Sequence, residues 1–283
     1  MFKMNLEQKV HYTLRIAAGL CFIGHGAFGI ITKSIWCNYF AVFGIGQALS
    51  FKLMPFVGTI DIICGLLILF YPIRAVVLWL VMWGFVTALL RPLSGEPFFE
   101  FIERFGNFGT PLALLILSPG VSRNFKKVFL PIKINTSIDE KTLAKMAIVL
   151  RFVVFFLFLG HGCLNLLEKK SLLDQYLSLG FIHPANTAQT IGIFEIIAAL
   201  SVLIRPFSTV LLILFFWKIS TELFYPHYEF FECIERAGSY GAILALWFVL
   251  NGTSASYKFR FDSGRFFNFL KLVQPSKNRS LTD

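Results

Sequence analysis

The sequence predicts an all-α membrane protein with eight transmembrane helices, arranged as two parallel tandem four-helix bundles. First, 56% of the 283 residues are hydrophobic, only 15% are charged and the mean hydropathy is +0.70, a balance that a surface in water could hardly accommodate. Second, mostly apolar runs of about 18 to 21 residues recur, the length that crosses a hydrocarbon core of roughly 30 Å. Third, the same pattern of residues occurs twice.

The repeat is visible as short motifs that recur in the same order in the two halves of the chain. An Arg and a later Gly-His-Gly motif occur at residues 15 and 24–26, and again at 151 and 160–162. The longest match pairs FFEFIER with FFECIER, each followed closely by a Gly. An ordered series of this kind indicates an internal duplication.

Each copy contains four apolar spans. They are expected at residues 14–32, 53–71, 73–90 and 97–117 in the first copy, and at 150–167, 188–204, 207–224 and about 228–250 in the second. This gives a first four-helix repeat over 1–118, a basic linker over 119–145, a second repeat over 146–251 and a basic tail over 252–283. Because each copy has an even number of spans, the two repeats are expected to be parallel.

The distribution of Lys and Arg predicts the orientation. Most of the 26 cations fall on the side of the two termini and the linker, which places both termini in the cytoplasm. These cations lie between hydrophobic runs and form no folded basic domain, so membrane lipid is an expected partner and nucleic acid is not. The linker is interpreted either as a topology determinant or as a site for anionic lipid. The five cysteines have no ligand-like spacing.

Ionisable side chains inside apolar spans are costly, so they are the candidate functional residues. Counting helical residues from the expected cytoplasmic boundary places His25, Asp61 and Asn107 at one depth, and gives His161 and Glu195 matching positions in the second copy. The fourth spans add a polar face with i, i+3, i+4, i+7 spacing, formed by Glu100, Glu103, Arg104 and Asn107 in the first copy and by Glu232, Glu235, Arg236 and Ser239 in the second. Each copy is thus expected to bring an imidazole, carboxylates and a guanidinium into one pocket.

These polar layers have two interpretations that the residues leave open. They are structural contacts that join helices, or pockets that handle protons or bind a ligand. No metal site is predicted, since one His and two carboxylates per copy are a thin ligand set. Only the second copy adds a Lys–Glu pair, Lys218 and Glu222, where the first has Gly84 and Ala88. This pair either reflects divergence after duplication or marks the second pocket as specialised.

The Arg that opens the first span, the Gly-His-Gly motif with a short amphipathic stretch after it, and the acid that follows a Gly in the second span resemble the DoxX-like membrane proteins. The second copy matches better, with LRFVVFFLFLGHGCLNLL, then SLLDQYLSLG, then IGIFEIIAALSVLIRP. The resemblance implies a four-helix bundle in the bacterial cytoplasmic (inner) membrane and a link to quinone-coupled or thiol-related oxidoreduction. The chain departs from the pattern in its duplication and in Asp61, where Glu195 is more typical.

Three functions follow as hypotheses. The leading one is a redox-associated protein that binds a small lipophilic ligand such as a quinone in one or both pockets. No haem, flavin or iron–sulfur signature occurs, so electrons would come from a redox partner protein, and whether the chain is an enzyme stays open. The alternatives are a small-solute transporter and a non-catalytic assembly factor for another membrane complex.

Overall fold

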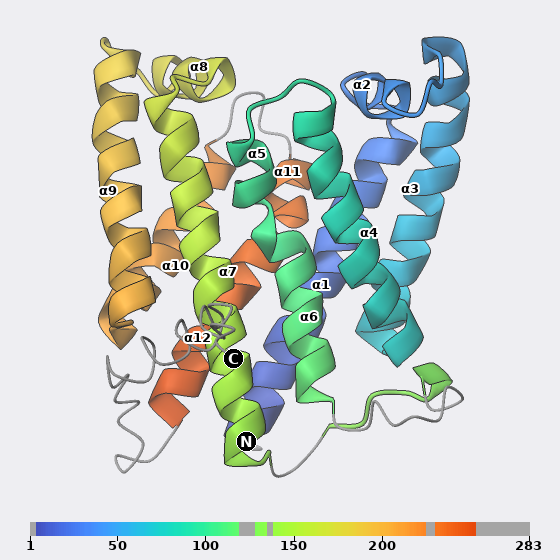
Figure 1. The fold of residues 1–283 in the computed structure, drawn as a ribbon, viewed down its shortest axis with the longest axis vertical. Coiled ribbons are helices and arrows are strands. Elements are labelled where there is room, and N and C mark those ends of the chain that lie inside the picture. Colours follow the sequence, from blue (N-terminus) through green and yellow to red (C-terminus); the bar gives the residue numbers. More distant parts are fainter. Residues whose placement is uncertain (1–3, 119–127, 135–137, 225–229, 253–283) are drawn as a thin grey trace, which may run out of the picture. The chain divides into compact units, whose positions relative to one another are not determined.

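The computed structural model of the protein describes residues 4–118, 128–134, 138–224 and 230–252, and most of these are helical. In chain order the helices are α1 (Leu6–Ile30), α2 (Trp36–Ala41), α3 (Gln47–Phe70), α4 (Arg74–Leu93), α5 (Phe99–Glu103), α6 (Phe105–Leu117), α7 (Glu140–Leu166), α8 (Lys170–Ser178), α9 (Pro184–Ile204), α10 (Ser208–Leu223), α11 (Phe230–Glu235) and α12 (Ala237–Gly252) (Figure 1). Residues 119–127 and 135–137 of the expected basic linker and nearly all of the expected basic tail lie outside the described residues.

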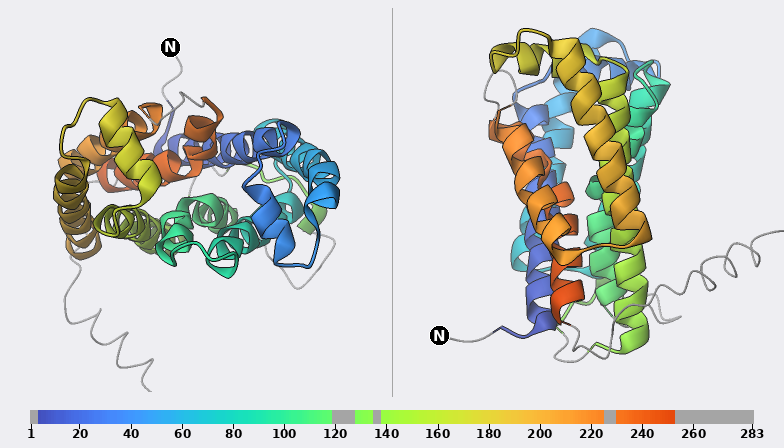
Figure 2. Two further views of the ribbon diagram at one scale, coloured as in Figure 1. Left: turned by 90° about the horizontal axis from the view of Figure 1, so that it is seen from above. Right: turned by 90° about the vertical axis from the view of Figure 1, so that its left-hand side faces the viewer.

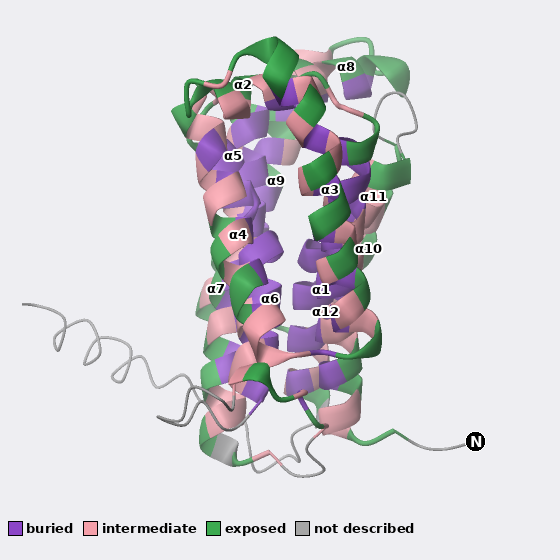
Figure 3. Ribbon diagram, turned by 90° about the vertical axis from the view of Figure 1, so that its right-hand side faces the viewer, coloured by how far each residue is buried: buried purple, intermediate pink, exposed green. Residues whose placement is uncertain are grey.

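Five helices, α1, α3, α4, α7 and α9, are long and apolar enough to cross a membrane. The shortest of them, α4, has 20 residues and therefore spans about 30 Å, the thickness of a hydrocarbon core. Exposed side chains on the outer helices are apolar and follow helical spacing, as Ile193, Ile197, Leu200 and Ile204 do on α9. Figure 3 shows the buried residues on the opposite, inward-facing sides of the helices. The described chain is thus all-helical with five candidate membrane spans.

The expected eight spans in two tandem bundles are not confirmed. Helices α10 and α12 have 16 residues each, and the fourth span expected at 97–117 is not one helix. Helix α5 ends at Glu103 and α6 begins at Phe105, because the backbone of Arg104 lies at φ −87° and ψ 15°, outside α-helical geometry. Helices α11 and α12 are interrupted in the same way at Arg236. Both interruptions fall among the candidate site residues.

The two halves of the chain are interlocked. Helix α5 packs against α7, and α11 packs against α1, so each short helix lies on the first long helix of the other half. Helices α6 and α12 also touch, where the Thr110 hydroxyl donates a hydrogen bond to the Gly238 carbonyl oxygen at 2.6 Å. All the described helices belong to one compact unit.

Several helix ends are fixed by identifiable side chains. Asn5 and Gln8 form a reciprocal capping box at the start of α1, and the Asp139 carboxylate caps α7, so both helices begin before the expected residues 14 and 150. The Arg15 guanidinium donates to the Ile68 and Leu69 carbonyl oxygens at 2.8 and 2.6 Å and closes the last turn of α3. Arg151 does the same at the end of α9. The Arg of the sequence motif therefore caps the following long helix.

The short helices α2 and α8 lie across the same end of the described helices (Figures 1 and 2). Helix α8 is the amphipathic stretch 170–178, and it contacts α9. Helix α2 contacts α3 and α4, and its residue Trp36 is buried. Residues of these two helices line the two polar pockets described next.

Candidate functional site

The Gly-His-Gly motifs position the two candidate histidines. A Cβ atom at Gly24 would clash with the backbone of α11, and one at Gly160 would clash with the backbone of α5, so only glycine lets these short helices approach. The second glycine of each motif faces the next long helix, where Gly26 meets α3 and Gly162 meets α9. The imidazole between the two glycines is consequently held between a short helix of the other half and a long helix of its own half.

Both histidines reach the acid that the sequence predicts as their neighbour. The Nδ1 atom of His25 lies 2.8 Å from Oδ2 of Asp61, and Nδ1 of His161 lies 2.6 Å from Oε2 of Glu195. A carboxylate next to Nδ1 favours the imidazole tautomer that has its proton on Nδ1. Nε2 then accepts a hydrogen bond in the neutral imidazole and donates one in the imidazolium. The structure therefore contains two His–acid pairs, one in each half.

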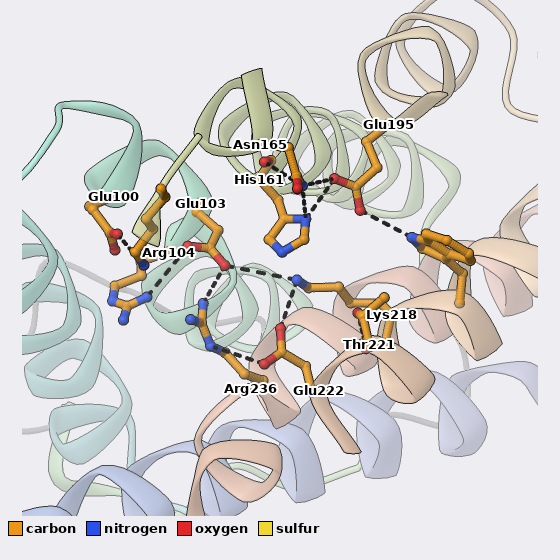
Figure 4. Close-up of polar contacts among 12 residues, drawn as sticks. Glu100, Glu103, Arg104, His161, Asn165, Glu195, Lys218, Thr221, Glu222 and Arg236 are labelled. Atoms are coloured by element: carbon orange, nitrogen blue, oxygen red, sulfur yellow. Dashed lines mark hydrogen bonds and ion pairs between the residues drawn. The ribbon is translucent and has the colours of Figure 1, made fainter. Parts of the chain in front are cut away.

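The His161 pocket is the site lined by His161, Glu103, Glu222 and Arg236, and Lys218 lies beside it in contact with the two carboxylates. Its charges are paired at short range: Arg236 Nη1 lies 2.8 Å from Glu103 Oε1, and Lys218 Nζ lies 2.7 Å from Glu222 Oε1 (Figure 4). The Lys218 ammonium is fully buried and is also 3.8 Å from Glu103 Oε1. The remaining cavity has about 10 Å³, room for about one water molecule. Side chains of the protein fill this pocket.

Further hydrogen bonds hold the carboxylate of Glu195, the partner of His161. The Trp217 indole donates to Glu195 Oε1 at 3.0 Å, and the Asn165 amide donates to Glu195 Oε2 at 3.3 Å. The Tyr176 hydroxyl donates to Asn165 Oδ1 at 2.5 Å. Asn165 and Tyr176 were not predicted from the sequence, although Asn165 follows His161 by one helical turn and so lies on the same face of α7.

The His25 pocket is larger and has aromatic walls. Its cavity has about 80 Å³ and is lined by His25, Trp36, Tyr39, Phe40, Phe43, Val57, Trp83, Thr87, Leu90, Arg91, Arg104, Asn107 and Glu235. The Trp36 ring lies 4.8 Å from the His25 ring. Arg91 is held by Glu96 at 3.1 Å and Glu100 at 3.5 Å. Sequence reasoning missed Trp36, Tyr39 and Arg91, because α2 and the end of α4 carry no motif.

Several buried polar atoms of this region have no hydrogen-bond partner among the described residues. They are Nε and Nη1 of Arg104, Oδ1 of Asn107, Oδ1 of Asp61 and Nε1 of Trp83. Arg104 is 5% exposed, and its ion pair with Glu103 is long, at 3.8 Å. Buried polar groups are normally satisfied, so this set indicates a place where water or a ligand supplies the missing partners.

The single polar face expected on each fourth span is wrong, because both spans are interrupted. Arg104 and Asn107 line the His25 pocket, whereas Glu103 lines the His161 pocket. Conversely, Glu235 lines the His25 pocket, and Arg236 lines the His161 pocket. Each half of the chain therefore contributes one carboxylate, Glu103 or Glu235, to the pocket of the other half.

Asp61, Glu195 and Lys218 do not line the cavities but contact residues that do, whereas three other predicted residues lie further away. Glu100 is fully buried and pairs with Lys169 as well as with Arg91. Glu232 pairs with Lys33. Ser239 packs against Gly106, where α12 passes α6. These residues join elements of the bundle.

Three groups in the His161 pocket are of metal-ligand type. Ligand atoms of Glu103, His161 and Glu222 lie within 4.8 Å of one another. The Lys218 ammonium, which contacts both carboxylates, supplies positive charge at this place. The set does not need a metal ion to balance its charge, and the expectation of no metal site stays a prediction.

No protein family, no curated protein and no solved structure matches this chain in the comparisons made. The resemblance to the DoxX-like proteins therefore stays a hypothesis based on sequence motifs.

Proposed function

We propose that this protein is a DoxX-like membrane protein that binds a small lipophilic ligand such as a quinone in the His25 pocket. The buried Arg104 guanidinium carries this proposal, because two of its nitrogens have no hydrogen-bond acceptor among the described residues. A buried donor that lacks an acceptor costs about 1–3 kcal/mol, more when charged, and a ligand oxygen would remove that cost.

The residues of the pocket fit a quinone head. A carbonyl oxygen of the ring would accept hydrogen bonds from Arg104, and Trp36, Phe40 and Phe43 offer aromatic surface to the ring. A quinone supplies two-electron chemistry that also takes up two protons. His25 lines the same pocket, and together with its partner Asp61 it is placed to hold a proton. Electrons would come from a redox partner protein, so the chain's own role is binding and proton handling.

We extend the proposal to the architecture. Helices α10, α5 with α6, and α11 with α12 would complete eight spans, and the paired motifs of the two halves support an ancestral duplication into two parallel four-helix units. The Lys and Arg bias supports cytoplasmic termini in a bacterial inner membrane. Lipid would cover the exposed apolar faces of the long helices.

A transporter is the second candidate, and the interruptions at Arg104 and Arg236 favour it. Non-helical backbone at membrane depth is tolerated where it lines a cavity or is buried in protein, and discontinuous helices form the substrate sites of many transporters. Both interruptions lie beside buried charged residues. Ligand uptake into protein-containing vesicles that follows an imposed pH gradient would favour transport over binding alone.

Titration of the detergent-purified protein with a short-chain quinone, followed by quenching of tryptophan fluorescence, tests the binding proposal. Trp36 and Trp83 line the pocket and should report the ligand directly. Arg104→Gln is expected to weaken binding by on the order of tenfold or more, since it removes a charged donor. Arg205→Gln makes the same change at an exposed residue and is the control. Equal affinities in the two variants would reject the proposed site.

A further inference from the structure

The His25 and His161 pockets contain equivalent Arg and Glu residues in two different states. In the His161 pocket the pair is closed, with Arg236 Nη1 donating to Glu103 Oε1 at 2.8 Å. The matching residues of the His25 pocket are Arg104 and Glu235, and no hydrogen bond or ion pair joins them within the described chain. In the His25 pocket, the buried Arg104 guanidinium and the buried Glu235 carboxylate are therefore not in direct contact.

Both members of this open pair need a partner of a specific kind. Arg104 has two nitrogens that donate to nothing among the described residues, so it needs an acceptor. Glu235 is 4% exposed and lines the same cavity, and no hydrogen bond or ion pair joins it to another described residue, so its carboxylate can accept from a donor in the cavity. A group between them must therefore accept from one side and donate to the other.

Resting on the proposed function, we propose that the His25 pocket selects ligands that carry an aromatic hydroxyl group, such as a quinol or a phenol. The hydroxyl oxygen accepts from Arg104, and its O–H donates to Glu235. A quinone carbonyl satisfies only Arg104, because it has no proton to donate. The aromatic side chains Trp36, Phe40 and Phe43 provide the surface for the ring. The reduced form of a quinone ligand therefore binds more tightly than the oxidised form.

The lining of the cavity separates this ligand class from an inorganic ion. Aromatic residues supply much of the wall, which favours a ring over a hydrated ion. The pocket also contains the Arg104 guanidinium, which lacks hydrogen-bond acceptors for two nitrogens among the described residues, and the Glu235 carboxylate, so neither a simple anion nor a simple cation satisfies both. A bridging water satisfies both charges but leaves the aromatic wall without a partner. The aromatic hydroxyl is the group that uses all three features.

A ligand series on the unchanged full-length protein tests the inference. The probes are decylhydroquinone, decylquinone, the dimethyl ether of decylhydroquinone and a para-alkylphenol, each titrated in detergent without oxygen. The hydroquinone is expected to bind about tenfold to a hundredfold more tightly than its ether, which cannot donate to Glu235. The phenol arm separates the two sources of a hydroxyl, since comparable binding of the phenol shows that a single hydroxyl is sufficient.

Glu235→Gln tests the acceptor, and Glu232→Gln on the same helix is its matched control, because Glu232 pairs with Lys33 outside the pocket. The first variant is expected to lose most of the preference for the hydroquinone over the ether, and the second to keep it. Equal binding of hydroquinone, quinone and ether, still weakened by Arg104→Gln, would overturn the hydroxyl selectivity and leave the binding site intact. If no probe binds, the proposed function fails as well. The ligand series needs no variant, so it stays decisive even if Glu235→Gln does not fold.

Discussion

The His25 and His161 pockets have the same His–acid pair but differ in what fills the space beside it. In the His161 pocket the Lys218 ammonium lies between Glu222 and Glu103 and leaves a cavity of about 10 Å³. In the first half, Gly84 and Ala88 occupy the equivalent sequence positions, and the neighbouring cavity has about 80 Å³. The two halves thus differ at two sequence positions one helical turn apart, beside a small polar cavity in the second half and a larger one in the first.

This comparison bears on the extra pair Lys218 and Glu222. The sequence leaves open whether the pair reflects divergence after duplication or marks the second pocket as specialised. In the second pocket Lys218 and Arg236 form ion pairs with Glu222 and Glu103 at 2.7 and 2.8 Å, whereas the Arg104 guanidinium of the first pocket has only a 3.8 Å ion pair with Glu103 among the described residues. We therefore interpret the second pocket as a structural core and the first as the ligand site. The following predictions test that division.

The largest effect is expected for Lys218→Ala. It removes the buried cation beside Glu222 and Glu103, and breaking a buried ion pair costs about 3–5 kcal/mol. Thermal unfolding in mild detergent should show a clear loss of stability. The double variant Lys218→Ala with Glu222→Ala removes both charges and should lose less. If the double variant is less stable than the single one, charge pairing is not what holds this pocket together.

The next largest effect is expected when the Lys–Glu pair of the second half is introduced at the equivalent positions of the first half. Gly84→Lys combined with Ala88→Glu should weaken binding of an aromatic ligand by about tenfold or more, or about 1.4 kcal/mol, because the new side chains occupy the space. Gly84→Ala is the control for crowding alone, since its Cβ would lie 3.2 Å from the Asn107 carbonyl oxygen. Unchanged ligand affinity in the double variant would show that residues 84 and 88 do not control the cavity.

The smallest effect concerns the length of the acid. Glu195 reaches Trp217, whereas Asp61 is one methylene shorter, and neither Asp61 Oδ1 nor Trp83 Nε1 has a hydrogen-bond partner among the described residues. Glu195→Asp should cost about 1 kcal/mol through loss of the indole hydrogen bond. Asp61→Glu should stabilise the protein by a similar amount. A lower melting temperature for Asp61→Glu would contradict this explanation of the unpaired atoms.

Part of this arrangement follows from the sequence. The apolar runs predict the long helices, and depth counting pairs His25 with Asp61 and His161 with Glu195, as the distances show. These predictions succeed because helical rise is constant, so equal spacing from a boundary gives equal depth.

Other features depend on packing between distant segments. Periodicity places Glu103 and Arg104 on one helix but gives no sign that the helix breaks between α5 and α6 and sends the two side chains to different pockets. The exchange of Glu103 and Glu235 between halves also has no local signal. Its trace in the sequence is Gly24 and Gly160, whose missing side chains admit the short helices, and their meaning is visible only when the partner backbones are known.

Native mass spectrometry of the detergent-purified protein, loaded with decylhydroquinone, tests the central division most directly because it counts ligands per chain. One ligand per chain is predicted, and it should be lost in Arg104→Gln and retained in Arg205→Gln. Two ligands per chain, or one that persists in Arg104→Gln, would show that the open pocket around His25 is not the binding site.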